Sequence, residues 1–383
     1  MKNRFIIFLF CHIICNCKSQ QTGGTMKDIK NILVKELEKN KTPSVQYIIF
    51  DRDDIIYKYQ SGFSNIDNQS IVNDDTTYNA FSVTKTFTAL AILQLAEKNL
   101  LNINNPVKDY WADFPYSSEI TIKHILTHSA GIPNPIPLSW IHLTEEHLSF
   151  EKNTFFQEII LKNNKEKSKP NVKFAYSNLG YYLLGVLIEI ITGQTYEDYV
   201  IENIIIPLNI NDNELDFTIK NSVNHATGYH KKSSFLNFIL GFFINKKEFI
   251  DKTEGKWKSF NNFYVNGSPY GGLIGTPSAF VVYLQDLLQP NSILLTKKYK
   301  ELLFTENVTN NGKTTGMCLS WFKGKLNEQT YFSHAGGGGG YYCEIRIYPE
   351  LGIGSVIMFN RTGMSDERYL DKLDILIING IKN

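Results

Sequence analysis

Residues 82–96 read Ser-Val-Thr-Lys-Thr-Phe-Thr-Ala-Leu-Ala-Ile-Leu-Gln-Leu-Ala, and this stretch decides the fold. From Phe87 to Ala96 it leaves almost no polar face, which predicts a helix buried on all sides at the centre of the molecule. Ser82 and Lys85 lie at its beginning, and a spacing of three places both side chains on one helical face. The stretch therefore predicts both a core helix and a reactive pair of residues.

The Ser82–Lys85 pair suits acyl-transfer chemistry. A serine in the first turn of a helix lies among free backbone N–H groups, and the helix dipole favours negative charge that develops there. A lysine one turn further, among apolar side chains, loses hydration. This loss lowers its pKa and leaves a neutral amine that can accept the serine proton. Taken alone, Ser-x-x-Lys also describes a capping serine beside a solvated lysine.

Two further segments favour the catalytic interpretation. Tyr176-Ser177-Asn178 directly precedes an apolar helix expected over Gly180–Thr192. A tyrosine that faces the Ser–Lys pair can relay a proton to a leaving group, and an asparagine can hold a substrate amide. His334-Ala335-Gly336 opens the glycine run Gly336–Gly340, where strand residues without side chains let another backbone approach closely. The ordinary interpretations are an aromatic residue beside a helix cap, and a flexible hairpin.

These three motifs, in this order and at these separations, resemble those of the class C β-lactamase family, which also holds DD-peptidases, D-amino-acid amidases and lipase-like esterases. The likeness includes the segments Thr121–Gly131 and Gly271–Ser278, and it runs from about residue 40 onward. It implies that Ser82 is the nucleophile and Lys85 its activator. Tyr176 would be the general base, which later protonates the leaving group.

The resemblance also implies a set of substrate-binding residues. Asn178 would bind the substrate amide or hold Lys85, and His334 would order the Tyr176 hydroxyl. Gly336 and Gly337 would line the site, and the N–H groups of Ser82 and Gly337 would form the oxyanion hole. The family's true β-lactamases carry a lysine where this chain has His334, so we expect esters, amides or cell-wall peptides to be preferred over β-lactams. Neither a metal nor another cofactor is expected.

The order of the predicted elements indicates an α+β fold. Strands are expected at both ends of the chain, with helices between them. The simplest fold with this order is one antiparallel sheet built from both chain ends. Helices would flank this β-lactamase/transpeptidase-like sheet. Residues 31–383 are predicted to form a single bilobed domain, with a sheet lobe over about 31–80 and 265–383 and a mainly helical lobe over about 81–264.

Other interpretations fit less well. Thr127-His128-Ser129-Ala130-Gly131 lacks the first glycine of a Gly-x-Ser-x-Gly nucleophile elbow, and its surroundings look helical. His124 and His128 are four apart, but Ile125 stands where His-Glu-x-x-His needs glutamate. The net charge of +1 gives no field to hold nucleic acid. A sensor that binds covalently without turnover is the remaining alternative, although all three motifs are intact.

The beginning of the chain reads as an export signal. Lys2 and Arg4 precede the apolar run Phe5–Cys15, which has the length of a signal-peptide core. Residues 1–17 are therefore predicted to be a leader and 18–30 a tether. Cys17 resembles the lipidated cysteine of bacterial lipoproteins, so we expect an exported protein that is periplasmic or anchored to a membrane. Cys318 and Cys343 are expected to be buried thiols in strands.

The segment Phe235–Ile244 is rich in aromatic and aliphatic residues and has two lysines on each side. Ten residues are too few to span a bilayer. The segment could cover an apolar acyl pocket or lie at an interface. The alternative, favoured by the usual location of such residues, is that it packs inward.

Overall fold

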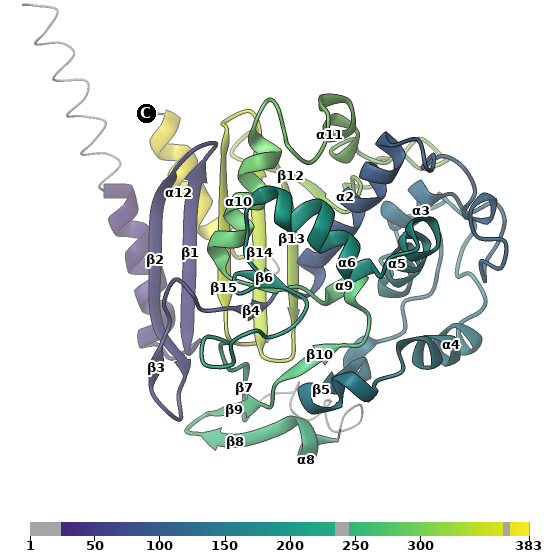
Figure 1. Ribbon diagram of the computed structural model, residues 1–383. Helices are drawn as coiled ribbons and strands as arrows, with labels where there is room; N and C mark the ends of the chain where they lie inside the picture. Colours follow the sequence, from purple (N-terminus) through teal and green to yellow (C-terminus); the bar gives the residue numbers. More distant parts are fainter. Residues whose placement is uncertain (1–23, 234–244, 363–367, 383) are drawn as a thin grey trace, which may run out of the picture.

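The computed structural model describes residues 24–233, 245–362 and 368–382. Its centre is a seven-stranded antiparallel sheet in the order β12-β13-β14-β15-β1-β2-β3 (Figure 1). The strands are β1 (Ser44–Asp51), β2 (Ile55–Asn65), β3 (Ser70–Ile71), β12 (Phe322–Leu326), β13 (Gln329–Gly338), β14 (Tyr341–Tyr348) and β15 (Ile353–Phe359). The predicted fold class is confirmed.

The two ends of the chain meet inside this sheet. Strand β1 lies between β15 and β2, with Val45 opposite Phe359 on one side and Ser61 on the other. The Ser44 N–H donates to the side-chain oxygen of Asn360 at 2.8 Å, although the two residues are 316 positions apart. The sheet is therefore closed by pairing of early strands with late ones.

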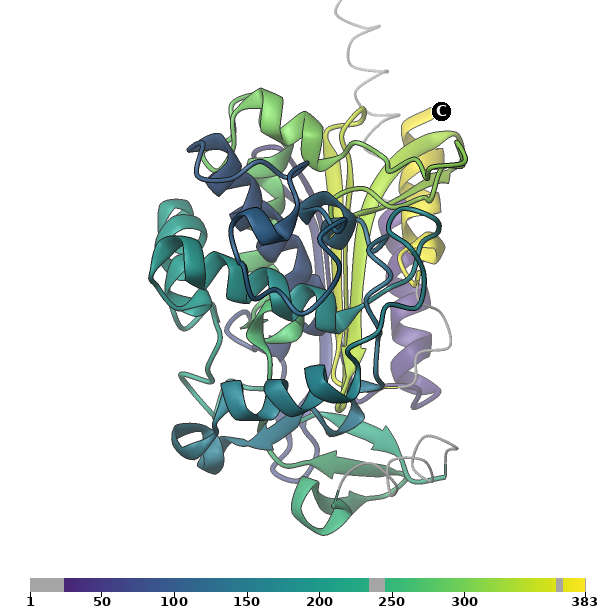
Figure 2. The same cartoon turned by 90° about the vertical axis from the view of Figure 1, so that its right-hand side faces the viewer.

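Helices cover both faces of the sheet (Figure 2). One face carries the larger group, and the other carries a helix over residues 24–38 together with the last helix. The other α-helices of the described ranges are α2 (Thr84–Glu97), α3 (Ile122–Leu126), α4 (Lys152–Lys162), α5 (Asn178–Thr192), α6 (Tyr196–Val200), α8 (Lys246–Phe249), α9 (Ser268–Gly271), α10 (Pro277–Leu288), α11 (Lys297–Leu303) and α12 (Asp371–Lys382).

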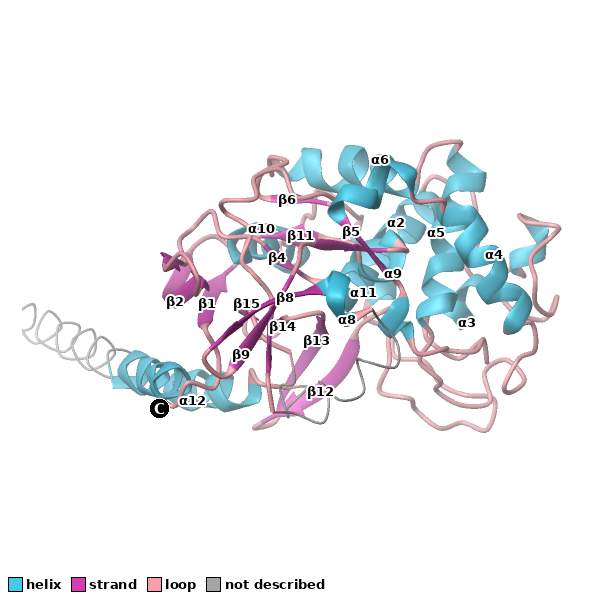
Figure 3. Ribbon diagram, turned by 90° about the horizontal axis from the view of Figure 1, so that it is seen from below, coloured by secondary structure: helices cyan, strands magenta, loops and turns pink. Residues whose placement is uncertain are grey.

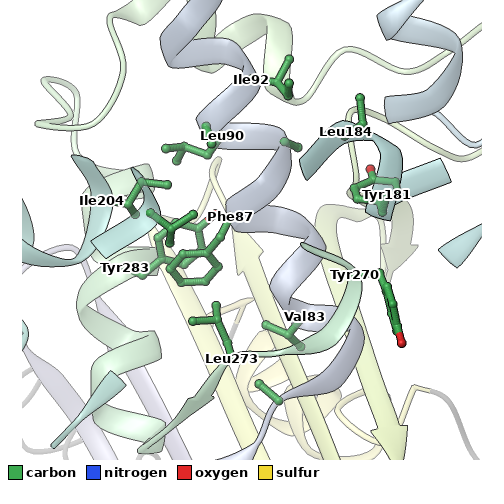
Figure 4. Packing of buried hydrophobic residues seen from close by; sticks show 14 of the residues in the cluster. Val83, Phe87, Leu90, Ile92, Tyr181, Leu184, Ile204, Tyr270, Leu273 and Tyr283 are labelled. Atoms are coloured by element: carbon green, nitrogen blue, oxygen red, sulfur yellow. The ribbon is translucent and has the colours of Figure 1, made fainter. Parts of the chain in front are cut away.

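Helix α2 forms the core as predicted. Every residue from Thr84 to Ala96 is buried. Its Phe87 ring stacks on Tyr283 of α10 with centroids 4.0 Å apart, and Figure 4 shows these rings beside Leu90 and Ile204. A helix that is apolar on all sides needs such surroundings, because no face of it can meet water without loss.

The predicted tether is corrected by the helix over residues 24–38. Residues 24–30 were expected to be an extended linker, but they form the beginning of this helix. Ile29 and Leu33, one turn apart, are fully buried in a cluster with Tyr47 and Ile357 of the sheet. Met26, Ile32 and Leu37 pack against the same cluster, and burial of this apolar face stabilises the helix.

Residues 81–264 carry short strands besides the helices, including the small sheet β7-β9-β8, two strands of which are labelled in Figure 3. Cys318 is expected in a strand, but β12 begins only at Phe322, because Ser320 has a φ of 71° and interrupts extended backbone. The short strands are β4 (Tyr78–Asn79), β5 (Ile141–Leu143), β6 (Leu215–Asp216), β7 (Tyr229–Lys231), β8 (Ile250–Glu254), β9 (Trp257–Phe260), β10 (Phe263–Val265) and β11 (Ile274–Gly275).

Several predictions concern residues that lie outside the described ranges. These are the leader over residues 1–17 with Cys17, residues 18–23 of the tether, and the segment Phe235–Ile244. Across the described ranges, no helix combines the length and apolar character needed to cross a bilayer. Cys318 and Cys343 are both buried and are not joined in a disulfide.

Candidate active site

Ser82 lies in a short 3₁₀ turn, Phe81–Val83, that leads directly into α2. The residue before it, Phe81, has a φ of 47°, which a non-glycine residue rarely adopts. A backbone conformation of this kind costs on the order of 1–3 kcal/mol and persists only where the surroundings hold it. Here the Ala80 N–H donates to the Leu273 carbonyl at 2.8 Å. The strained turn presents Ser82 at the edge of the helical core.

Lys85 lies one turn beyond Ser82 and is fully buried. Its Nζ donates to Ser82 Oγ at 3.0 Å and to the Tyr270 carbonyl at 2.7 Å. Burial lowers the pKa of the Lys85 amine well below its usual value. An amine in this state, bonded to the serine hydroxyl, can accept a proton at moderate pH.

Tyr176 completes the group around Ser82. Its hydroxyl donates to Ser82 Oγ at 2.9 Å, and its ring centre lies 5.0 Å from Lys85 Nζ. The tyrosine is held by the beginning of α5, where the Ser177 hydroxyl accepts from the Gly180 N–H at 2.9 Å as a helix cap. Residues from two helices thus converge on one oxygen atom.

Asn178 lies in the first turn of α5 and is nearly buried. Its side-chain amide donates to the side-chain oxygen of Asn134 at 3.2 Å, and its backbone N–H donates to the same oxygen at 3.0 Å. In the described part of the chain, the hydrogen bonds of Lys85 go to Ser82 and Tyr270 instead. Of the two roles expected for Asn178, the geometry therefore favours contact with a substrate.

His334 is buried in β13 and is electrically neutral. Its Nδ1–H donates to the Ser320 carbonyl at 2.5 Å. Burial, followed by the nearby charge of Lys85, lowers the pKa of His334 to about 3. Its Nε2 has no hydrogen-bond partner among the described residues. The side chain provides no positive charge at neutral pH.

Strand β13 passes directly beside the turn that carries Ser82. A Cβ atom on Gly336 would lie 2.1 Å from the Ala80 carbonyl oxygen and 2.7 Å from the Ser82 nitrogen. At Gly337 a Cβ would meet only ordinary contacts, the nearest at 3.5 Å. The backbone of the glycine run therefore lies against the nucleophile turn, as predicted for a site that admits an acyl group.

Comparison with known proteins agrees with this geometry. The family model described as Beta-lactamase matches residues 29–379. The chain belongs to the beta-lactamase family. Protein flp of Staphylococcus aureus (strain N315) is 25% identical over 374 residues, which cover 94% of this chain and 68% of that protein.

Two solved structures show the same β-lactamase/transpeptidase-like fold. The octameric penicillin-binding protein homologue from Pyrococcus abyssi has a TM-score of 0.74 at 23% identity, covering 93% of this chain and 77% of that one. The D-amino acid amidase from Ochrobactrum anthropi SV3, complexed with D-phenylalanine, has a TM-score of 0.74 at 19% identity, covering 94% and 99%. The beta-lactamase family and its neighbours are serine hydrolases.

This beta-lactamase-family site contains two residues that the sequence did not indicate as functional. The Tyr270 carbonyl holds Lys85, and its residue directly precedes the Gly271-Gly272 pair. His128 stacks on Tyr176 with ring centres 4.2 Å apart and accepts the Ser177 N–H at 3.1 Å through Nδ1. Burial, together with Lys85 and His334, lowers the pKa of His128 well below its usual value. Its place in the family-like segment Thr121–Gly131 was the available signal.

Ser129 and His124 belong to the alternative motifs in the sequence, and both have structural contacts. Ser129 is buried, and its hydroxyl is paired with Thr127 at 2.9 Å. His124 belongs to a capping box at the beginning of α3, where its Nδ1 accepts the Thr121 N–H at 3.1 Å. Both residues are therefore explained by local structure in this beta-lactamase-family fold.

A pocket of about 140 Å³ opens beside Ser82. Apolar and aromatic side chains form most of its wall, with Ser82, Asn178 and the Gly337–Gly339 backbone on one side. The principal wall residues are Phe81, Leu138, Trp140, Phe260, Phe263 and Tyr270. An acyl group bound to Ser82 would have this space beside it.

Proposed function

We propose that this protein is a serine hydrolase that cleaves carboxylic esters or amides through an acyl-enzyme on Ser82. One observation carries the proposal: Ser82 Oγ lies within hydrogen-bond distance of both the Lys85 amine and the Tyr176 hydroxyl. A weak nucleophile becomes reactive when a base of suitable pKa contacts it directly. The lowered pKa of Lys85 supports this role.

The proposed reaction has two balanced steps. Ser82 Oγ attacks the carbonyl carbon while its proton passes to the Tyr176 oxygen, and the Tyr176 proton passes to the neutral Lys85 amine. Tyr176 then gives the serine proton to the departing oxygen or nitrogen and regains its own from Lys85, so that R–CO–X–R′ and Ser–OH become Ser–O–CO–R and H–X–R′. Water next attacks the acyl-enzyme and releases R–COOH and free Ser82. The N–H groups of Ser82 and Gly337 would stabilise the oxyanion in both steps.

We propose that ester hydrolysis is faster than β-lactam hydrolysis. The carboxylate of a β-lactam drug needs a cation, and the neutral His334 provides none. D-Amino-acid amides are a second substrate class within the proposal. The alternatives are a class C-type β-lactamase or DD-carboxypeptidase, and a sensor that is acylated without turnover.

A covalent probe and a substrate panel test these alternatives. A fluorophosphonate should add once, at Ser82, and Ser82→Ala should lose at least ~10³-fold in kcat/KM. Ser129→Ala is the matched control and should keep both labelling and activity. The panel compares short-chain nitrophenyl esters, nitrocefin and a D-Ala-D-Ala peptide. Labelling at Ser129, or nitrocefin turnover faster than ester turnover, would contradict the proposal, and a stable adduct without product would support the sensor.

We further propose that the protein is exported and loses its leader, with Cys17 as the candidate lipid attachment site. The charged and apolar order of residues 2–15 supports this. N-terminal sequencing of the mature protein and fractionation of a Cys17→Ala variant test the proposal. An unprocessed chain recovered from the cytoplasm would refute it.

A further inference from the structure

We propose that the pocket beside Ser82 selects substrates whose acyl group carries a compact, apolar and uncharged side chain, with about the size of one benzene ring. This inference rests on the proposed function, since it names the substrate class of the same site. The pocket would hold the acyl side of the scissile bond. The comparison of esters with β-lactams concerns a different group, the drug carboxylate that would face His334.

The wall of the pocket is uncharged. Among the described residues that line it, none carries a charged side chain. The polar side-chain groups of the wall are all uncharged: those of Ser82 and Asn178, the Tyr270 hydroxyl and the Trp140 N–H. A charged group would therefore lose hydration here without gaining a partner of opposite charge, which is unfavourable. An apolar group of the same shape would gain free energy from leaving water.

The volume of the pocket limits the size of its occupant. A cavity of about 150 Å³ with apolar walls is known to hold one benzene molecule in another protein. The pocket beside Ser82 has a volume of about 140 Å³. A phenyl ring or a branched aliphatic group therefore fits, whereas an acetyl group would leave most of the space unfilled and a long acyl chain would exceed it.

The size of the pocket is fixed by close packing of its walls. The Phe81 and Phe263 rings contact each other with centroids 6.3 Å apart. A Cβ on Gly338 would lie 2.9 Å from the Phe81 ring, and one on Gly339 would lie 2.2 Å from the Phe263 ring. The turn after β13 therefore lies directly against both rings and leaves them little room to retreat from a larger occupant.

Leu138 offers a place to change this selectivity without disturbing the core. It lies in the 3₁₀ turn Pro137–Ser139, is half-buried and lines the pocket. Ile136, two residues earlier, is 61% exposed and does not line the pocket. The two positions form a matched pair, since one substitution at each gives the same change in charge at different distances from the acyl group.

The test uses 4-nitrophenyl esters, so that the leaving group stays constant. Acetate, phenylacetate and dodecanoate vary the size, and we expect kcat/KM for phenylacetate to exceed each of the others by about tenfold. Charge is tested by 4-(trimethylammonio)butyrate against 5,5-dimethylhexanoate, which has the same shape without the charge. The wild type should prefer the neutral ester by about tenfold or more.

Variants at the two matched positions complete the test. Leu138→Glu should raise the ratio of cationic to neutral ester by about tenfold, while Ile136→Glu should leave that ratio unchanged. Thermal melts establish that each variant is folded. If Leu138→Glu does not fold, Leu138→Ala decides, because a larger pocket should shift the preferred ester toward longer chains.

The outcomes separate this inference from the proposed function. Equal kcat/KM across the size series, or a wild-type preference for the cationic ester, would overturn the inference while ester hydrolysis itself remained. No hydrolysis of any ester, with no adduct at Ser82, would instead contradict the proposed function.

Discussion

The chemistry proposed for Ser82 depends on a lysine whose neighbours are uncharged. Lys85 donates to a hydroxyl and to a carbonyl, and the Tyr176, Tyr181 and Tyr270 rings lie within 6 Å of its Nζ. Carboxylates would keep the amine protonated, whereas burial among uncharged groups favours its neutral form. Burial alone therefore lowers the pKa of this base.

His128 is the residue whose replacement should reveal how Tyr176 is held. Its ring packs on Tyr176, and its Nδ1 accepts the N–H of the next residue, Ser177. The backbone of His128 is left-handed, with a φ of 51°. His128→Phe keeps a ring but removes the acceptor, while His128→Asn keeps an acceptor and tolerates this backbone conformation. We expect kcat to fall by about tenfold or more in both variants, with a smaller change in KM, because a displaced Tyr176 weakens proton transfer rather than binding.

His124→Ala is the matched control for these variants. His124 lies one helical turn earlier and closes the capping box of α3. Its loss should lower the free energy of unfolding by about 1 kcal/mol and leave kcat unchanged. If the two kinds of variant gave the same kcat, His128 would have a structural role only.

Local spacing explains which site residues could be predicted from the sequence. Ser82 and Lys85 follow the helical repeat, so their contact was expected. The Tyr270 carbonyl and the His128 ring reach the site through tertiary packing, to which no spacing rule applies. Tyr270 contacts Lys85 from 185 positions away.

At the scale of elements, β13 can pass the turn that carries Ser82 only because it has a glycine at position 336. Gly336→Ala would place a methyl group 2.1 Å from a backbone oxygen that cannot rotate away. The strand or the Ser82 turn must then shift, and a displacement of about 1 Å can cost about 10²-fold in rate. We expect a loss of this size in kcat/KM for the 4-nitrophenyl esters.

Gly337→Ala provides the comparison for that variant. The added methyl group would meet contacts of 3.5 Å or more, and the N–H group proposed for the oxyanion hole is kept. Its loss in kcat/KM should be much smaller than that of Gly336→Ala. Equal losses would show that the whole strand, rather than one close approach, determines the effect.

The elements that were mispredicted are those in which tertiary contacts decide the outcome. The helix over residues 24–38 is stabilised by an apolar stripe that packs on the sheet, and this contact cannot be predicted from the segment alone. Its first residues, Gly24-Thr25-Met26-Lys27-Asp28, look like a linker in isolation. The strand expected from Cys318 fails because Ser320 turns to give its carbonyl to His334, a contact across the chain.

For the whole molecule, buried histidines predict sensitivity to acid. Burial lowers the pKa of both His225 and His334 to about 3, whereas the unfolded chain titrates near 6.5. Between these pH values the unfolded state binds protons that the folded state does not bind. The free energy of unfolding therefore falls as the pH drops through this window. Each histidine contributes a slope of about 1.4 kcal/mol per pH unit.

Urea unfolding at several pH values tests this assignment. His225→Gln removes one of the two buried histidines and should make the acid-induced loss of stability shallower. An unchanged slope in this variant would contradict the assignment.

The pairing of β1 with β15 has a consequence for the order of events after synthesis. Ser82, Lys85 and Tyr176 precede β13, so a growing chain carries all three before the strand that faces them exists. Because β1 pairs with β15, in which Phe359 lies opposite Val45, contacts of long range must form before the sheet is complete, and such topologies fold slowly. The order of the strands therefore delays completion of the site. During refolding, esterase activity should return no earlier than the formation of the sheet, which is monitored by circular dichroism.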